Sequence, residues 1–326
     1  MTIKQRAIKN LAPKISKLLL LTNSHDGTSD TLVDLCVDRG VDVFRWNMDL
    51  WNFYEASATI SGYSFADNYG RKADSNEDGL LAIWRKPFVK LSQRINQNIE
   101  EDFAREQLRV YLRSLSHELC KNHKLKLVDP FLENSFSKLI QLQIADKFFE
   151  IPGWRFTTSN FPDTDQKLVL KSIAYPMLSN GMTIFTNFES PRDIRSPYPW
   201  LFQDPIVGGY DVTCVFISGK CFWYESEFNR TSEAMDWRKE IQTEKESRWL
   251  EIKNLETDQL SIKVYEFMRE VGLHYGRLDF IKDSSSIYWF LECNVNGEFG
   301  WLDDESKKLH KLFLDAIFDT NSVIIH

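Results

Sequence analysis

The hydrophobic positions in the first quarter of the chain fall into short apolar runs separated by turn-rich loops. Residues 17–22 (KLLLLT) predict a buried strand, and a helix capped by Ser29 or Asp30 follows to about Arg39. Residues 41–46 alternate as a second strand, and residues 80–85 form a third apolar run that ends at Lys86-Pro87. A strand–helix–strand order predicts a parallel sheet. A G-x-G-x-x-G loop is absent, which argues against a dinucleotide-binding unit.

The rest of the chain mixes helical and strand patterns. Helical spacing of apolar residues predicts helices at 91–121, 135–149 and 260–271. Strands are predicted at 168–173, 182–186 (after the turn Ser179-Asn180-Gly181), 200–206, 211–218 and 221–225, with a hairpin at 276–281 and 287–292. Val128-Asp129-Pro130 marks a boundary. The pattern therefore predicts an α/β chain of more than one domain.

Composition narrows the class of protein but not its function. The 326 residues suggest two or three domains, and 43% hydrophobic content excludes disorder as the main state. A net charge of −7 argues against a nucleic-acid binder. The five cysteines form no C-x-x-C pair, which predicts a reducing, cytoplasmic location. The apolar run at 18–21 is too short for a membrane span. Residues 1–16 form a basic tail, either a solvated segment or a docking arm for an acidic peptide.

Candidate chemistry concentrates in the predicted C-terminal hairpin. Asp279 lies in its first strand, and Glu292 and Asn294 lie in the second, two residues apart and so on one face. Carboxylate and amide oxygens are ligands that suit Mg²⁺ with phosphate. The alternative is a carboxylate pair held by Arg or Lys in a structural network.

Two lysines add to this pattern. Lys138 lies in the first turn of the helix predicted at 135–149. Lys171 lies at the end of an apolar strand, where its flexible side chain could reach a phosphate. Either lysine alone would be read as a solvated surface residue. Their value lies in the order along the chain: Lys138, Lys171, Gln203–Ile206, Asp211, Asp279, Glu292 and Asn294.

That order resembles the ATP-grasp superfamily from about Pro130 to the C-terminus. The resemblance implies that Lys138 and Lys171 contact the phosphates of ATP, and that Asp279, Glu292 and Asn294 hold two Mg²⁺ ions. It also implies a hinge that binds the nucleotide, formed by Gln203, Asp204 and Ile206. Asp211 would bind the ribose, and Leu291 would pack on adenine. The fold implied is an N-terminal pre-ATP-grasp α/β domain followed by two ATP-grasp subdomains that clamp ATP.

A narrower resemblance extends over most of the chain. The loop Asp26–Asp30, the segment Phe44-Arg45-Trp46-Asn47 with Asp49, Ile83–Pro87, Asp236-Trp237-Arg238 and Glu292–Gly297 are similar to elements of graspetide ligases, the microviridin-type maturases of ribosomal peptides. The chain departs from that pattern at three places: Thr213 stands where many relatives carry Arg, Val295 replaces the usual Pro, and the lid at 174–181 is poor in glycine.

The resemblance implies an enzyme that activates side-chain carboxylates of a precursor peptide as acyl phosphates and closes ester or amide rings. It implies domains at 1–128, 129–205 and 206–326, and a homodimer. Lys171 and Arg238 are the predicted catalytic residues, although Arg238 could instead form an ordinary ion pair on a helix face. Arg85, Lys86 and Asp236 are predicted to meet the peptide, but Arg85 and Lys86 could equally serve a salt bridge between domains. The alternatives are another ATP-grasp carboxylate–amine ligase and a non-catalytic nucleotide- or peptide-binding protein.

Overall fold

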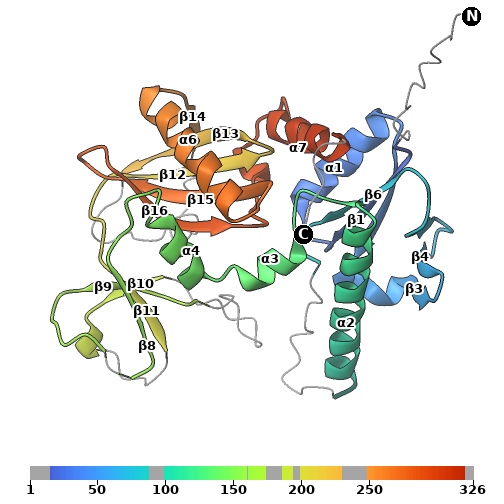
Figure 1. The fold of residues 1–326 in the computed structure, drawn as a ribbon, viewed down its shortest axis with the longest axis horizontal. Coiled ribbons are helices and arrows are strands. Elements are labelled where there is room, and N and C mark those ends of the chain that lie inside the picture. Colours follow the sequence, from blue (N-terminus) through green and yellow to red (C-terminus); the bar gives the residue numbers. More distant parts are fainter. Residues whose placement is uncertain are drawn as a thin grey trace, which may run out of the picture. The chain divides into compact units, whose positions relative to one another are not determined.

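The computed structural model describes residues 15–87, 99–159, 161–173, 186–193, 199–229 and 248–319 (Figure 1). The predicted turn and strand at 179–186 lie outside these residues, apart from Thr186. The described chain divides into two compact units. Unit 1 contains residues 15–87, 105–127 and 310–319, and unit 2 contains residues 99–104 and 128–309 without the gaps. The predicted domain boundaries remain predictions. None of the described helices is long and apolar enough to cross a membrane.

Unit 1 is built on a parallel sheet, as its apolar runs predict. The strand order is β2-β1-β6-β7, made from β1 (Lys17–Thr22), β2 (Asp42–Asn47), β6 (Leu80–Trp84) and β7 (Leu125–Lys126). Four consecutive leucines of β1 are fully buried, which a strand covered on both faces requires. Helix α1 (Gly27–Asp38) follows β1 and is capped by the Asp26 side chain. The predicted caps Ser29 and Asp30 are wrong, because both lie inside the helix.

A small antiparallel sheet in unit 1 is not predicted by the sequence pattern. It follows the 3₁₀ helix η1 (Met48–Phe53) and contains β3 (Tyr54–Thr59), β4 (Gly62–Asp67) and β5 (Lys72–Asp74). Phe65 of β4 packs against Trp46 with a ring separation of 5.0 Å, which joins this sheet to the core around β2. The helices α2 (Ile99–Lys121) and α7 (Lys308–Phe318) also contribute most of their residues to unit 1.

Unit 2 begins with two short helices and a four-stranded sheet. The helix predicted at 135–149 is present but shorter, as α4 (Lys138–Ala145). A separate short helix, α3 (Pro130–Ser135), precedes it and was not predicted, and Phe136 and Ser137 between the two leave helical geometry. The sheet has the order β10-β9-β11-β8, from β8 (Trp154–Thr157), β9 (Leu168–Lys171), β10 (Asn187–Glu189) and β11 (Trp200–Gln203), with η2 (Pro191–Asp193) after β10. Leu168, Leu170 and Phe202 form its core.

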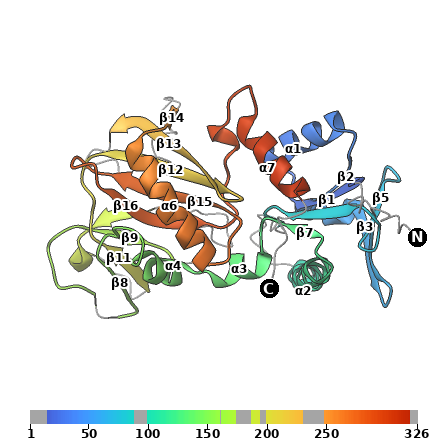
Figure 2. The same ribbon diagram turned by 45° about the horizontal axis from the view of Figure 1, so that its top comes forward.

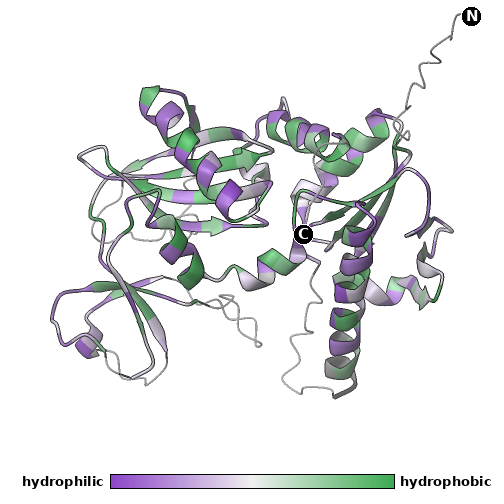
Figure 3. Ribbon diagram, in the orientation of Figure 1, coloured by the Kyte–Doolittle hydropathy of each residue, from purple (hydrophilic) through white to green (hydrophobic). Residues whose placement is uncertain are grey.

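A five-stranded antiparallel sheet forms the other part of unit 2. Its order is β14-β13-β12-β15-β16, from β12 (Tyr210–Ile217), β13 (Lys220–Asn229), β14 (Trp249–Ile252), β15 (Tyr275–Lys282) and β16 (Tyr288–Asn294). Helix α6 (Leu255–Glu270) packs on one face (Figure 2), and η4 (Gly300–Leu302) follows β16. Hydrophobic residues follow the strands of this sheet (Figure 3). The aromatic core around Phe149, Phe280 and Phe290 lies directly beside the polar ends of β15 and β16.

Candidate active site

The three predicted metal ligands lie together on β15 and β16. Asp279 pairs with Glu292 across the two strands, whereas Phe280 pairs with Phe290, so Leu291 is the extra residue of a β-bulge. Leu291 and Glu292 therefore both oppose Asp279. The Asn294 amide donates to Asp279 Oδ2 at 2.9 Å and to Glu292 Oε1 at 3.3 Å. The spacing of two residues between Glu292 and Asn294 thus places both on one face, as the sequence predicts.

Arg277 is a site residue that the sequence analysis missed. Its Nε and Nη2 donate to the two carboxylate oxygens of Asp279 at 3.0 and 2.8 Å, and its Nη1 donates to the Glu298 carbonyl. A Cβ at Gly297 would lie 2.6 Å from the Arg277 Cβ, so the chain needs glycine there for this approach. The signal was present in the sequence, because an Arg two residues before Asp279 on a strand must share its face.

The charge on Glu292 is held by cations from three elements. Lys138 Nζ lies 2.9 Å from Glu292 Oε2, and about a quarter of the Glu292 side chain is exposed. Burial alone would raise the pKa of Glu292, but the charges of Lys138, Lys171 and Arg277 outweigh it and lower the pKa to about 2. Lys138 therefore forms an ion pair with the predicted metal ligand, and the charge of Lys171 also lowers the pKa of that ligand.

The donor set fits a hard cation such as Mg²⁺. Two carboxylates and an amide oxygen are hard ligands, and no described cluster of three or more His, Cys, Asp or Glu residues offers a softer or more complete cage. Mg²⁺ commonly binds through one or two carboxylates and completes its shell with phosphates and water. The Asn294 side chain presents its nitrogen to the carboxylates here, so it would have to turn by half a rotation to present its oxygen.

The predicted hinge carries a buried hydrogen-bond donor that suits a ligand. Gln203 is 2% exposed, and its Nε2 has no hydrogen-bond partner among the described residues. Such an orphan is costly unless something binds it. The hinge backbone is held by a bond from Asp204 N to Gly153 O at 2.8 Å, and a Cβ at Gly153 would meet the Asp204 carboxylate at 2.3 Å. These features fit a nucleotide base at the hinge.

The other predicted nucleotide contacts flank the same two sheets. Lys171 ends β9, and Ile206 lies between β11 and β12 with part of its surface exposed. Asp211 lies on β12, half-buried and paired in register with Ile281. Leu291 is half-buried at the bulge beside Glu292. Their proposed roles remain predictions.

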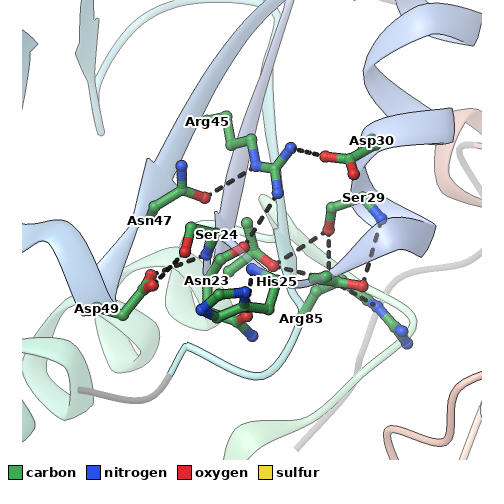
Figure 4. A network of polar contacts seen from close by, with 11 residues as sticks. Asn23, Ser24, His25, Ser29, Asp30, Arg45, Asn47, Asp49 and Arg85 are labelled. Atoms are coloured by element: carbon green, nitrogen blue, oxygen red, sulfur yellow. Dashed lines mark hydrogen bonds and ion pairs between the residues drawn. The ribbon is translucent and has the colours of Figure 1, made fainter. Parts of the chain in front are cut away.

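Arg85, one of the predicted peptide-binding residues of unit 1, belongs to a polar network around Asn23 and Ser29 (Figure 4). The Arg85 side chain has no exposed surface and its Nε lies 3.8 Å from Asp26 Oδ2. Asp26 also accepts a bond of 2.7 Å from the Thr22 hydroxyl. Both residues of this pair lie in unit 1. An Arg with no exposed surface would have to move before it could meet a peptide.

Lys86 has a different conformation from its neighbour. It is half-buried, with a φ of 44°, and its carbonyl accepts a bond from the Asn23 side chain at 3.1 Å. A left-handed lysine before a proline is unusual and must be held by its surroundings. Asp236 and Arg238 lie outside the described residues, so their predicted roles remain predictions.

The comparisons with known proteins concern the fold. No protein-family model and no curated protein matches the sequence. A ligase of the ATP-grasp type from Chryseobacterium gregarium, associated with ribosomal peptides and bound to ADP and a leader and core peptide, has 21% identity and a TM-score of 0.75, over 95% of this chain and 100% of that chain. The macrocyclase MdnC from Microcystis aeruginosa, bound to the precursor peptide MdnA, has 20% identity and a TM-score of 0.74, over 93% and 100%.

A third similar structure is the ATP-grasp ligase PsnB with a minimal precursor, Mg and ADP. It has 14% identity and a TM-score of 0.66, over 94% of this chain and 98% of that chain. At these identities the likeness concerns the fold, and it extends over nearly the whole length of each chain. The chain therefore has the fold of the ATP-grasp ligases, which confirms the fold that its motifs imply.

Proposed function

We propose that this protein is an ATP-dependent ligase that activates side-chain carboxylates of a precursor peptide and closes ester or amide macrocycles. The observation that carries the proposal is the Glu292 cluster: two carboxylates and an amide on adjacent strands, surrounded by Lys138, Lys171 and Arg277. The fold supports it, because similar structures are ligases crystallised with precursor peptides and ADP.

The chain's own residues would divide the work of phosphoryl transfer, which depends mostly on positioning and neutralisation of charge. Asp279, Glu292 and Asn294 would hold Mg²⁺, which would neutralise phosphate charge. When ATP binds, the ammonium groups of Lys138 and Lys171 would bind phosphate oxygens in place of Glu292, since a lysine ammonium is a point charge on a flexible side chain. The Gln203 amide and the hinge would bind the base. Two Mg²⁺ ions remain the expected number.

The reaction proposed for the peptide has two steps. A side-chain carboxylate oxygen attacks the γ-phosphorus of ATP, and an acyl phosphate forms. The bond between the γ-phosphorus and the β–γ bridging oxygen breaks, and ADP leaves. A Ser or Thr hydroxyl or a Lys amine of the same peptide then attacks the acyl carbon and loses its proton. Phosphate leaves, and an ester or amide closes the ring. We propose an acidic core with Ser, Thr or Lys as the substrate, recognised through a leader, and a homodimer as the assembly.

The test uses the full-length protein with a candidate precursor, which is any short peptide encoded beside its gene that has a core rich in Ser or Thr and in Glu or Asp. Mg²⁺ and ATP should produce ADP and a peptide that has lost one water for each ring, measured by mass spectrometry. ATP turnover without dehydration of that peptide would favour a different carboxylate–amine ligase. Absence of ADP formation with any acidic Ser/Thr/Lys peptide would instead favour the non-catalytic alternative.

A further inference from the structure

Thr213 lies directly against the predicted metal carboxylate. It occupies β12, pairs in register with Asp279 on β15, and is 1% exposed. Its hydroxyl is 2.8 Å from Asp279 Oδ1 and 3.3 Å from the Leu278 carbonyl oxygen, so the carboxylate is the closer acceptor. A buried hydroxyl bonded to a carboxylate forms a charge-assisted hydrogen bond, which is stronger than a bond between neutral groups.

Four donated bonds hold Asp279, and they divide between its two oxygens. Oδ1 accepts from Thr213 and from Arg277 Nε. Oδ2 accepts from Arg277 Nη2 and from Asn294 Nδ2, and the same Asn294 nitrogen reaches Glu292. Oδ2 is therefore the oxygen on the side of the other two predicted ligands. Oδ1 accepts from Thr213 and Arg277, neither of which is a predicted ligand.

Thr213 has the shortest side chain of these three donor residues and the fewest bonds to rotate. Arg277 has a long side chain, and Asn294 must itself turn if its oxygen is to ligate a cation. Threonine is short and β-branched, which restricts its χ1 rotation, and β12 is an interior strand between β13 and β15. The Thr213 bond can therefore persist while the other donors rearrange.

We propose that Thr213 is a positioning residue that fixes the plane of the Asp279 carboxylate and keeps Oδ2 turned toward Glu292 and Asn294 for the divalent cation. The inference rests on the proposed function, because that function places a cation at Asp279. The inference gives a specific role to Thr213, which the sequence shows only as a threonine in the place where many similar ligases carry Arg. Residues that orient metal ligands by hydrogen bonds raise metal affinity without touching the metal.

The experiment compares Thr213→Val, which keeps the shape and removes the hydroxyl, with Thr213→Ser, which keeps the hydroxyl. The probe is Mn²⁺, and its dissociation constant is measured by electron paramagnetic resonance on the full-length protein with ADP. Thr213→Val should weaken Mn²⁺ binding about 10-fold, the lower end of the range for such partners, and Thr213→Ser should keep the wild-type affinity. If the valine variant does not fold, Thr213→Ala replaces it and should show the same loss.

A purely structural role predicts a lower melting temperature for the valine variant with unchanged Mn²⁺ affinity, and that result would overturn the proposal. Equal losses in the valine and serine variants would also overturn it. Glu292→Gln separates this failure from failure of the proposed function. If Glu292→Gln loses Mn²⁺ while Thr213→Val does not, only the role of Thr213 is wrong. If Glu292→Gln binds Mn²⁺ like the wild type, the metal site itself is wrong.

Discussion

Two carboxylate–guanidinium pairs in this protein contain the same groups in different surroundings. In unit 1, the side chains of Asp26 and Arg85 are 1% and 0% exposed. In unit 2, the side chains of Asp279 and Arg277 are 24% and 15% exposed, and Glu292 and Lys138 lie beside them. Both pairs are ionic, so an ion pair alone does not mark a site. The pair in unit 2 differs because it has access to solvent and lies beside further cations. We therefore expect this pair, and not the pair in unit 1, to exchange its partners for a ligand.

The largest expected effect breaks the buried pair of unit 1. Arg85→Met should lower the free energy of unfolding by about 3–5 kcal/mol, because it removes the cation beside the buried Asp26 carboxylate. Urea denaturation followed by circular dichroism measures it. The matched control is Arg39→Met, which removes an exposed pair with Asp315 and should cost at most about 1 kcal/mol. Equal losses in the two variants would remove the distinction between the pairs.

The next effect concerns Glu292, which lies beside the Asp279–Arg277 pair of unit 2. Glu292→Gln should reduce ATP turnover by at least about 100-fold, because it removes a charged ligand of a metal that contributes several kcal/mol of charge stabilisation. The variant should remain folded, since Lys138 keeps access to water. Glu266→Gln, an exposed position on α6, is the control for the loss of one carboxylate. A Glu292→Gln protein with normal turnover would leave this carboxylate as a structural group.

A smaller effect is expected for the phosphate contacts. Lys171→Ala should weaken ADP binding roughly 10-fold, which matches the loss of one hydrogen bond to a charged group. Isothermal titration calorimetry measures the affinity. Lys167→Ala, an exposed lysine just before β9, removes the same charge and should bind ADP like the wild type. If both lysine variants behave alike, Lys171 has no specific role.

The smallest effect is a pH dependence that sharpens the comparison. The pKa of Glu292 is lowered from 4.5 to about 2 in the folded protein. A lowered pKa means that the carboxylate stabilises the fold above pH 4.5 and that this stabilisation is lost as the pH falls toward 2. The stability difference between the wild type and Glu292→Gln should therefore shrink over that interval, measured by denaturation at each pH. A difference that does not depend on pH would mean that the cations do not hold Glu292 ionised.

Much of the site could be predicted because strand periodicity places residues on faces. The apolar runs at 276–281 and 287–292 predict the hairpin, and the two-residue spacing of Glu292 and Asn294 predicts their common face. The same periodicity implies that Arg277 shares the face of Asp279. An arginine near an acid is typical of an ordinary ion pair, so the sequence alone does not identify Arg277 as a site residue.

Other features leave weak signals in the sequence. The break between α3 and α4 has no Gly or Pro; Asp129 and Pro130 mark the start of α3, but only Ser137 marks the start of α4. The sheet β3-β4-β5 consists largely of small and polar residues, so it lacks the apolar alternation that identifies a strand. The burial of Arg85 depends on packing around Asp26, which local pattern does not report. The bulge at Leu291 arises from the pairing of two strands and has no local signature.

The most direct test of the central claim is a calorimetric titration of ADP with and without Mg²⁺ into the wild type and Glu292→Gln. If Asp279, Glu292 and Asn294 hold a cation against the nucleotide phosphates, Mg²⁺ should strengthen ADP binding to the wild type and have little effect on the variant. Equal strengthening of both proteins by Mg²⁺ would contradict the account. It would return the Glu292 cluster to the class of structural ion pairs, together with Asp26 and Arg85.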